Sequence, residues 1–308
     1  MKKANSLKDN VPLLEHRQNY PTNYQGASAQ AIQHHYDAGN EFYQLWLDST
    51  LTYSCALWDE HDSNDCLETA QLRKLDYYIE QARAKAVERV LEIGSGWGSM
   101  AKRLVEVHDV KQVTTLTLSQ AQLDWIQSFN NPQIDIRLEN WCDHCPPEPY
   151  DAIISVAAFE AFAKLGLSET EKIEAYRCFF EKCHQCLKAG RWMSLQTIIY
   201  ENANVETFSK FMGEEIFPES DLPHLSEIAK ATQGLFEIIV MRNDRQHYER
   251  TLKVWLKNLK ENRSKAIELA GENLVSRYEK YLSFCAIGFY TGTMNLSRSI
   301  KQLNTAVL

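Results

Sequence analysis

The stretch that decides the fold is VLEIGSGWG, residues 90–98. A short apolar run enters a turn in which Gly94, Gly96 and Gly98 alternate with other residues, and the following SMAKRLVE has the apolar spacing of a helix. Alternating glycines let the backbone of such a turn approach a ligand closely. The stretch is typical of a nucleotide-type cradle between a strand and a helix, although a tight β–α turn without a ligand has the same pattern.

The flanking residues indicate which ligand this cradle would hold. In dinucleotide sites an acidic residue about 20 positions further on holds the ribose. Here the second predicted strand ends in TLTLS, residues 115–119, which offers only hydroxyls. The acid lies inside the first strand instead, as Glu92, and no phosphate-binding lysine follows the glycines. S-adenosylmethionine therefore fits this turn better than NAD or ATP.

Strand and helix patterns alternate along the rest of the chain. Residues 65–86 have helical spacing and precede the glycine turn. Further strand candidates are IDIRL, YDAIISVAAF, GRWMSLQTIIY and FEIIVMR, with helical stretches before the last two. This alternation predicts an α/β fold, a doubly wound, mostly parallel sheet with helices on both faces.

Composition and charge argue against several classes of function. The chain has 308 residues, of which 44% are hydrophobic, and a formal net charge of −8. Without a block of Lys and Arg, this charge disfavours nucleic acid or an anionic membrane surface as a main partner, because both are bound through their phosphates. No apolar run approaches the ~18–20 residues of a membrane span, and the first residues lack the apolar segment of a secretory signal. We therefore expect no integral membrane contact and a cytoplasmic location.

Two CxxC pairs raise the alternative of a zinc site. The pairs are Cys142 with Cys145 and Cys183 with Cys186, and four such thiols can bind zinc tetrahedrally. Their separation lies far from the usual ribbon-type spacing. The second pair also falls in a predicted helix that should stop at residues 189–190, an Ala-Gly pair. Core packing is the favoured interpretation, and no metal is expected.

One carboxylate stands alone in an apolar run. Glu160 lies within SVAAFEAFAKLG, residues 155–166, after a predicted sheet strand. Acids are seldom buried without a partner, because desolvation costs several kcal/mol or raises the pKa until the group is neutral. An acid in this position favours a functional role over a structural one.

Eight stretches in a fixed order resemble a known family, the cyclopropane fatty acid synthases and mycolic acid cyclopropane synthases, which are S-adenosylmethionine-dependent transferases. The resemblance runs from about residue 34 to the end. The stretches are HYDAGNEFYQLWLD (35–48), LTYSCALWDE (51–60), LETAQLRKLD (67–76), VLEIGSGWGS (90–99), LTLSQAQLDWIQ (116–127), SVAAFEAF (155–162), FPESDLPHLSEI (217–228) and HYERTLKVW (247–255).

This resemblance implies a Rossmann-like class I methyltransferase fold with added helices. The implied division is an N-terminal segment with a helical cap at residues 1–75 and a methyltransferase core at residues 76–308. Helical lid insertions are expected near residues 200–225 and 247–285, where they would cover a lipophilic acceptor.

The resemblance also implies a set of cofactor-binding residues. The strand acid and the glycines would hold the methionine end of S-adenosylmethionine, a Thr-Leu-x-x-x-Gln run the ribose, and a tryptophan the adenine. A carboxylate is charge-complementary to the cofactor's amino group and sulfonium, and a tryptophan can stack on a purine. The implied residues are Tyr53, Ser54, Glu92, Gly94, Gly96, Trp97, Thr117, Leu118, Gln122, Trp141 and Cys142.

A bicarbonate ion beside the transferred methyl group is a further implication of the resemblance. Cys55, Glu160 and Tyr248 match the family's cysteine, glutamate and tyrosine at this ion. Val156 stands where a backbone carbonyl contacts it. In the family the ion serves as the base that removes a proton during ring closure.

Two histidines of the family pattern are missing. The position of the histidine that contacts the ion is Gln196, and the histidine that usually follows the glutamate is Ala161. A glutamine can donate an amide hydrogen bond to an oxyanion, but it carries no charge and cannot relay a proton near neutral pH. Bicarbonate binding and ring closure therefore stay open, and the catalytic candidates are Cys55, Glu160, Gln196 and Tyr248.

Three functions fit these observations. The first is transfer of a methyl or methylene group to carbon of a lipophilic unsaturated acyl chain or hydrophobic metabolite, either free or carrier-bound. The second is N- or O-methylation of a small lipophilic natural product or amine, as in plant coclaurine-type N-methyltransferases of the same wider group. The third is a cofactor-binding protein without transferase activity, because a fold does not guarantee a reaction. Assembly into a homo-oligomer is left open.

Overall fold

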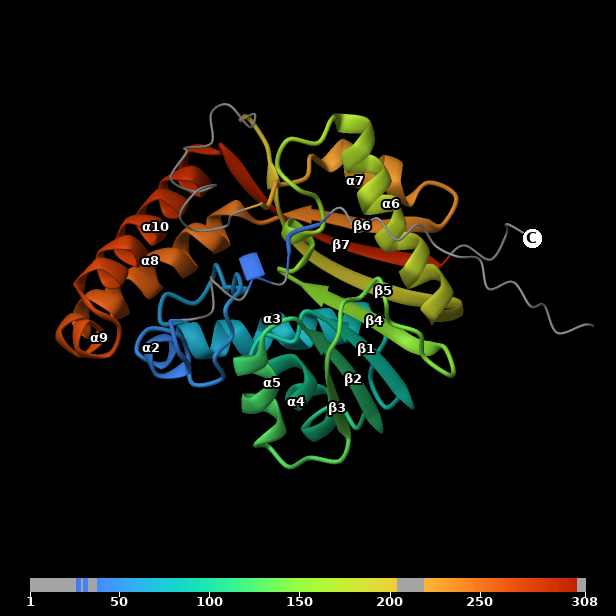
Figure 1. Cartoon of the computed structure of the whole chain (residues 1–308), viewed down its shortest axis with the longest axis horizontal. Coiled ribbons are helices and arrows are strands. Elements are labelled where there is room, and N and C mark those ends of the chain that lie inside the picture. The colour runs from blue at the N-terminus through green and yellow to red at the C-terminus, as the bar shows by residue number, and fades with distance from the viewer. Residues whose placement is uncertain (1–25, 29, 33–37, 204–218, 304–308) are drawn as a thin grey trace, which may run out of the picture.

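The computed structural model describes residues 26–28, 30–32, 38–203 and 219–303 (Figure 1). These ranges contain most of the predicted core and the whole of the second expected insertion, residues 247–285. Residues 1–25 and the part of the first insertion at residues 204–218 lie outside the described residues.

Seven strands form the central sheet. They are β1 (Arg89–Ile93), β2 (Gln112–Thr117), β3 (Ile134–Leu138), β4 (Tyr150–Val156), β5 (Leu187–Tyr200), β6 (Phe236–Asn243) and β7 (Met294–Leu303). Their order across the sheet is β3-β2-β1-β4-β5-β7-β6. Strands β1 to β5 are parallel, and β7 runs antiparallel to both β5 and β6. The predicted α/β class with a mostly parallel sheet is confirmed.

Helices cover both faces of this sheet (Figure 1). Five of them flank it, with α3 to α5 on one face and α6 and α7 on the other. Side chains of β1 alternate accordingly, since Val90 packs with α3 and α4 whereas Leu91 packs with α6. The bounds are α3 (Leu67–Gln81), α4 (Ser99–Glu106), α5 (Gln120–Gln127), α6 (Glu169–Cys186) and α7 (Leu225–Thr232).

Four further helices of the described ranges form a cap at one end of the sheet. They are α2 (Asn40–Gln44), α8 (Arg245–Glu261), α9 (Arg263–Ala270) and α10 (Glu272–Thr291). Aromatic side chains from both ends of the sequence meet in this cap, as in the contact between the rings of Trp46 and Trp255, whose centroids are 5.7 Å apart. The expected insertion at residues 247–285 is thus helical, as predicted, and it packs on the N-terminal aromatic residues.

The sheet order reverses between β1 and β4. In open α/β sheets the crevice for ligands lies at such a switch point, beyond the carboxyl ends of the strands. The glycine turn follows β1, and the short 3-10 helix η1 (Phe159–Ala161), which contains Glu160, follows β4. The topology therefore places both sequence features at the same edge of the sheet.

The end of α6 differs from the prediction. The helix stops at Cys186 rather than at residues 189–190, and β5 begins directly at Leu187. Pairing with β4 explains the earlier switch, because Leu187 pairs with Tyr150, and Lys188 Nζ lies 2.8 Å from Asp151 Oδ1. Cys183 and Cys186 are buried in the core, as the packing interpretation predicted.

Two further properties concern membranes and metals. None of the helices within the described ranges combines the length and the apolar composition that a bilayer crossing requires. Across the same residues, His, Cys, Asp and Glu side chains do not gather in groups of three or more that could hold a metal ion.

Candidate active site

The turn after β1 has the shape of a cofactor cradle. Gly94 has φ +92°, and a Cβ there would lie 2.7 Å from Ala158 Cβ, so the turn packs directly against the segment after β4. Gly96 has φ +49°, and nothing lies within 4 Å of where its Cβ would be. The left-handed backbone and this open space would allow a small molecule to approach the turn closely.

Glu92 is a buried acid beneath this turn. Its Oε2 accepts a hydrogen bond of 2.6 Å from Thr115 Oγ1 on β2. Burial raises the pKa of the Glu92 carboxyl to about 8, although the Thr115 hydroxyl and the charge of Lys74 act in the opposite direction. A carboxyl in this state gains from a nearby positive charge, such as an ammonium group.

A second buried polar group of the candidate site, a side-chain amide, lies after β2. Thr117 Oγ1 donates to Gln122 Oε1 at 2.7 Å, and Ser119 caps the helix that carries Gln122. This bond fixes the amide, and its Nε2 is buried with no hydrogen-bond partner among the described residues. A buried amide donor without a partner is costly, which makes Gln122 a ready donor for a ligand hydroxyl.

The residues predicted to contact the adenine, Trp141 and Cys142, lie beside a cluster of aromatic side chains. The Trp141 ring packs against Phe162 and Phe179, each with centroids 5.2 Å away. Cys142 beside it is only partly buried, and desolvation raises the pKa of its thiol to about 11, so it stays neutral.

Helix α3 positions the predicted Tyr53–Ser54–Cys55 segment. Gln71 Nε2 donates to the carbonyls of Thr52 and Ser54, at 3.1 and 2.9 Å. One turn further along, the buried Lys74 donates to Ser54 Oγ at 2.7 Å. Burial lowers the pKa of Lys74 to about 7, so its ammonium is easily neutralised. Sequence reasoning did not assign either α3 residue to the site, although a lysine on the apolar stripe of a helix is a visible signal.

Two aromatic residues of the cofactor prediction join the cap to this site. Trp97, in the glycine turn, donates through Nε1 to Asn40 Oδ1 of α2 at 2.8 Å. The Tyr53 hydroxyl lies 3.3 Å from that of Tyr281. Burial raises the pKa of Tyr53 well above its ordinary value, and the hydroxyl of Tyr248 nearby adds to that shift.

Glu160 is held at the carboxyl edge of β4. Its Oε1 accepts a 2.6 Å hydrogen bond from the backbone N–H of Ile198 on β5, where the β4 ladder has ended. The other oxygen, Oε2, is buried and has no partner among the described residues. Burial raises the pKa of Glu160 to about 7. The isolated acid of the sequence is thus half satisfied by the fold, and one oxygen is free to contact a ligand.

The other three catalytic candidates lie on different elements. Cys55 and Gln196 meet at a residue that sequence reasoning missed, the fully buried Arg298 of β7, which lies 3.5 Å from Cys55 Sγ and 2.7 Å from Gln196 Oε1. Tyr248 of α8 packs its ring on Phe289, with centroids 4.5 Å apart. The run MNLSRSIKQL contains two cationic residues, Arg298 and Lys301, within a predicted strand, and this is the signal that could have identified Arg298.

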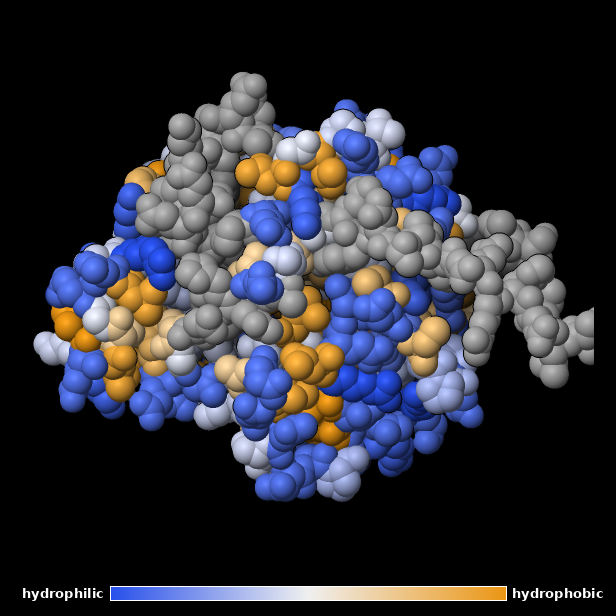
Figure 2. All heavy atoms as spheres, in the orientation of Figure 1, coloured by the Kyte–Doolittle hydropathy of each residue, from blue (hydrophilic) through white to orange (hydrophobic). Residues whose placement is uncertain are grey.

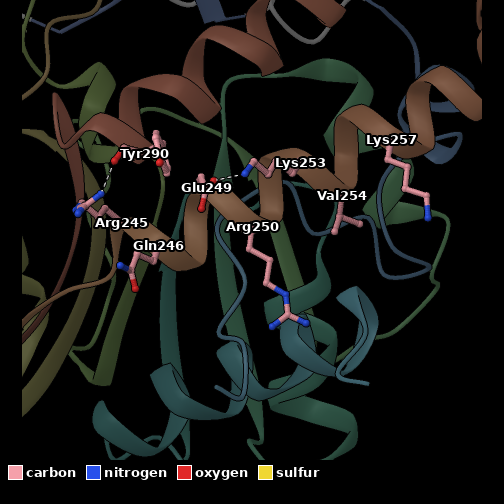
Figure 3. Close-up of a pocket in the computed structure, with 8 residues that line it drawn as sticks. All are labelled: Arg245, Gln246, Glu249, Arg250, Lys253, Val254, Lys257 and Tyr290. Atoms are coloured by element: carbon pink, nitrogen blue, oxygen red, sulfur yellow. Dashed lines mark hydrogen bonds and ion pairs between the residues drawn. The ribbon is translucent and has the colours of Figure 1, made fainter. Parts of the chain in front are cut away.

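A separate groove lies on the outer side of α8 (Figure 3). It has a volume of about 560 Å³ and is lined by Arg245, Gln246, Glu249, Arg250, Lys253, Val254, Lys257 and Tyr290. Its basic side chains are partly occupied, since Lys253 pairs with Glu249 and Arg245 donates to the Tyr290 carbonyl. None of the predicted site residues lines this groove.

Comparisons with known proteins agree with this geometry. The sequence profile of a family described as mycolic acid cyclopropane synthetase matches residues 24–299. The chain is 33% identical over 281 residues to the S-adenosylmethionine-dependent methyltransferase UmaA of Mycobacterium tuberculosis. This alignment covers 85% of this chain and 93% of UmaA. The chain is 33% identical over 289 residues to cyclopropane mycolic acid synthase 1 of the same species, covering 88% and 96%.

Solved structures give the same result. The cyclopropane synthase MmaA2 from Mycobacterium tuberculosis has a TM-score of 0.81 at 30% identity, covering 91% of this chain and 100% of that chain. The cyclopropane synthase CmaA1, in a complex with SAH and CTAB, has a TM-score of 0.80 at 31% identity, covering 90% and 99%. A coclaurine N-methyltransferase with a TM-score of 0.74 is only 19% identical, so it shows a shared fold alone.

Proposed function

Because the chain belongs to the mycolic acid cyclopropane synthetase family, we propose that it transfers a one-carbon unit to a carbon atom of a lipophilic unsaturated acyl chain. The chain is an S-adenosylmethionine-dependent methyltransferase by its family and its fold. The observation that carries the choice of a carbon acceptor is Glu160, a buried acid at the carboxyl end of β4 with one oxygen that has no partner among the described residues.

The residues of the described site fit S-adenosylmethionine. The open space at Gly96 accommodates its methionine part, and Glu92 below the turn favours the positive charge of its amino group. Gln122 Nε2 is a buried donor that has no partner within the described ranges, and it suits the ribose. The Trp141 ring would pack on the adenine. Ser54, which Lys74 of α3 holds, would contact the cofactor from the opposite side.

Glu160 would stabilise the positive charge that forms on the acceptor during the reaction. When bound, S-adenosylmethionine supplies an electrophilic methyl group on a sulfonium. An alkene that takes up this methyl group would form a carbon–carbon bond while the methyl–sulfur bond breaks and a neutral thioether leaves. The alkene thereby becomes a carbocation, which then must lose a proton. The ionised Glu160 carboxylate stabilises such a cation, and Oε2 can take the proton, either from the new methyl group with ring closure or from a neighbouring carbon without it.

The same residues are compatible with a bicarbonate ion. Gln196 Nε2 is a buried donor with no partner among the described residues, and Glu160 Oε2 is a buried acceptor without one. A singly protonated oxyanion can satisfy both groups, by accepting from the amide and donating to the carboxylate. Bound there, bicarbonate would supply a base, and Gln196 and Glu160 would hold it.

The acceptor we propose is a carrier-bound or free acyl chain. The cap is rich in aromatic residues, and hydrophobic surface lies over the α8–α10 end of the molecule (Figure 2), where Leu269, Phe284 and Ile287 are exposed. The basic groove on α8 lies at the same end (Figure 3) and would attract an acidic carrier despite the chain's net charge of −8.

A labelled cofactor tests the proposal. The protein is incubated with S-adenosylmethionine carrying a trideuterated methyl group, together with unsaturated acyl chains that are free or attached to an acidic carrier, and the products are read by mass spectrometry. We expect label in the acyl chain. Three retained deuterium atoms indicate methylation, and two indicate that the methyl group lost a deuteron during ring closure. Label found only on amine or hydroxyl acceptors would contradict the proposal.

A further inference from the structure

Arg298 is a buried cation with a complete set of partners. Its side chain is fully buried on β7. Nε donates to Asp244 Oδ2 at 2.6 Å, and Nη2 donates to the Ala56 carbonyl at 3.0 Å and to Cys55 Sγ at 3.5 Å. Nη1 donates to Tyr78 OH at 2.9 Å and to Gln196 Oε1 at 2.7 Å. These five contacts match the five N–H groups of a guanidinium, so its position is fixed by the fold.

The contacts of Arg298 determine how the Gln196 amide is oriented. Gln196 and Arg298 are direct partners across β5 and β7. Gln196 Oε1 accepts from Arg298 and also from Tyr78 OH at 3.0 Å, which uses both of its lone pairs. A flipped amide would place an NH₂ group against a guanidinium that cannot accept a hydrogen bond. Nε2 is therefore the end that faces away from Arg298, and it is buried with no partner in the part of the chain that the structure describes.

A buried acceptor with no partner among the described residues is held at a position two residues further along β5. Glu160 is bound through Oε1 to the N–H of Ile198, which is two residues after Gln196 on β5. Positions two apart on a strand are separated by about 7 Å along it. The free Oε2 of Glu160 and the free Nε2 of Gln196 thus occur at the same end of β5, next to the switch point of the sheet.

The cluster around Arg298 retains a positive charge. Asp244 is its acidic partner, and the same carboxylate also binds Arg242 Nε at 2.7 Å. Burial raises the pKa of the Cys55 thiol to about 12, so Cys55 is neutral and does not cancel the charge. One carboxylate thus faces two guanidinium groups, and Arg298 is the buried one of the two.

We propose that Arg298 is a positioning residue that fixes Gln196 as the donor to a small oxyanion and supplies the positive charge which a histidine at position 196 would otherwise carry. This inference rests on the proposed one-carbon transfer, for which the oxyanion is the base. The ligand class is a singly protonated oxyanion such as bicarbonate. Arg298 acts through Gln196 and through its charge. None of its own N–H groups donates a hydrogen bond to the ion.

Anion binding can be measured without any acceptor lipid. The protein is loaded with S-adenosylhomocysteine and titrated with ¹³C-labelled bicarbonate, and binding is followed by ¹³C NMR line broadening. We expect saturable binding in the natural protein and a loss of affinity of tenfold or more in Arg298→Met. Affinity for S-adenosylhomocysteine, measured by calorimetry, should change less than twofold.

Two further variants separate positioning from folding. Lys301→Met removes another fully buried cation from β7, on the opposite face of the sheet, and should leave bicarbonate affinity within twofold. In the double variant Arg298→Met with Gln196→His, the imidazole should restore part of the affinity and make it depend on pH near the pKa of histidine. A purely structural Arg298 would not produce this rescue. If Arg298→Met does not fold, Arg298→Lys takes its place, because it keeps the charge but loses the fork that holds Gln196.

The outcomes distinguish this inference from the proposed function. It is overturned if the natural protein shows no saturable bicarbonate binding, or if a folded Arg298→Met binds bicarbonate as tightly as the natural protein. If bicarbonate binding depends on Arg298 but labelled methyl groups never reach an acyl chain, the inference stands and the proposed acceptor is wrong.

Discussion

Arg298 and Gln196 lie 102 residues apart in the sequence, yet Nη1 of one donates to Oε1 of the other at 2.7 Å. They are direct partners in the antiparallel pairing of β5 and β7. The absence of a histidine at position 196 is therefore accompanied by a buried cation one strand away. This pairing gives the site a fixed amide where the family pattern has an imidazole.

Glu160 should determine how activity and stability depend on pH. Its pKa is raised to about 7 by burial, from an ordinary value of 4.5. The ionised form is therefore disfavoured in the folded state, and the free energy of unfolding should fall as pH rises from about 4.5 through 7. Glu160→Gln should remove this fall, so the variant is the more stable protein at pH 8 and similar to the natural one at pH 4.5.

The same variant should lose activity by at least about a hundredfold, in the range expected for loss of a general base or a stabilising charge. Rates across pH 5–9 and urea unfolding at pH 4.5 and 8 measure the two effects. Glu106→Gln, on the exposed face of α4, is the matched control and should change neither. Activity equal to that of the natural protein in Glu160→Gln would exclude the proposed role.

Two glycines of the same turn should behave differently when replaced by alanine. A Cβ at Gly96 would meet no protein atom within 4 Å, whereas one at Gly98 would lie 2.8 Å from both Ile126 and Phe129. Gly96→Ala should cost about 1–2 kcal/mol from its left-handed backbone and weaken S-adenosylmethionine binding strongly. Gly98→Ala should add about 1–3 kcal/mol of overpacking to a similar backbone cost. Calorimetric binding and thermal unfolding test this, and unchanged cofactor affinity in Gly96→Ala would show that the open space is not the cofactor site.

Gln122 should contribute to cofactor affinity through one hydrogen bond. Gln122→Met removes the Nε2 that has no partner among the residues that the structure describes, and a lost hydrogen bond of about 1–1.5 kcal/mol corresponds to roughly tenfold weaker binding. Gln120→Met, in the first turn of the same helix, removes only an exposed contact to Asp124 and should have no effect. Titration calorimetry with S-adenosylhomocysteine compares the two. Equal affinities would place the ribose elsewhere.

Lys301 should destabilise the protein at neutral and lower pH. Its Nζ donates to Ser299 Oγ and lies over the Phe180 ring, and burial lowers its pKa to about 7. The unfolded chain stays protonated up to about pH 10.4, so folding is penalised progressively as pH falls from there to 7. Lys301→Met should raise the midpoint of thermal unfolding at pH 7, with little effect near pH 11. A lower midpoint at pH 7 would mean that the ammonium has a favourable role in the core.

Much of the site could be predicted because it rests on local patterns. The glycine turn, the strand before it and the acid inside that strand are neighbours in the sequence, and they remain neighbours in the structure. Glu160 was conspicuous as an acid in an apolar run, and the alternation of strands and helices placed it at the edge where β1 and β4 end. The end of α6 could not be predicted in this way, because the pairing of Leu187 with Tyr150 overrides the local helical pattern.

The sequence by itself determined the fold class, the family and the cofactor, since each depends on short local patterns and on their order along the chain. Only the tertiary structure decided how Gln196 is oriented and what charge lies beside it. Arg298 contacts Ala56, Tyr78, Gln196 and Asp244, which come from four distant parts of the chain. Their meeting depends on the register of β5 with β7 and on the packing of α3 beneath the sheet. Local periodicity contains no information about either, because register and packing are set by contacts between segments rather than within them.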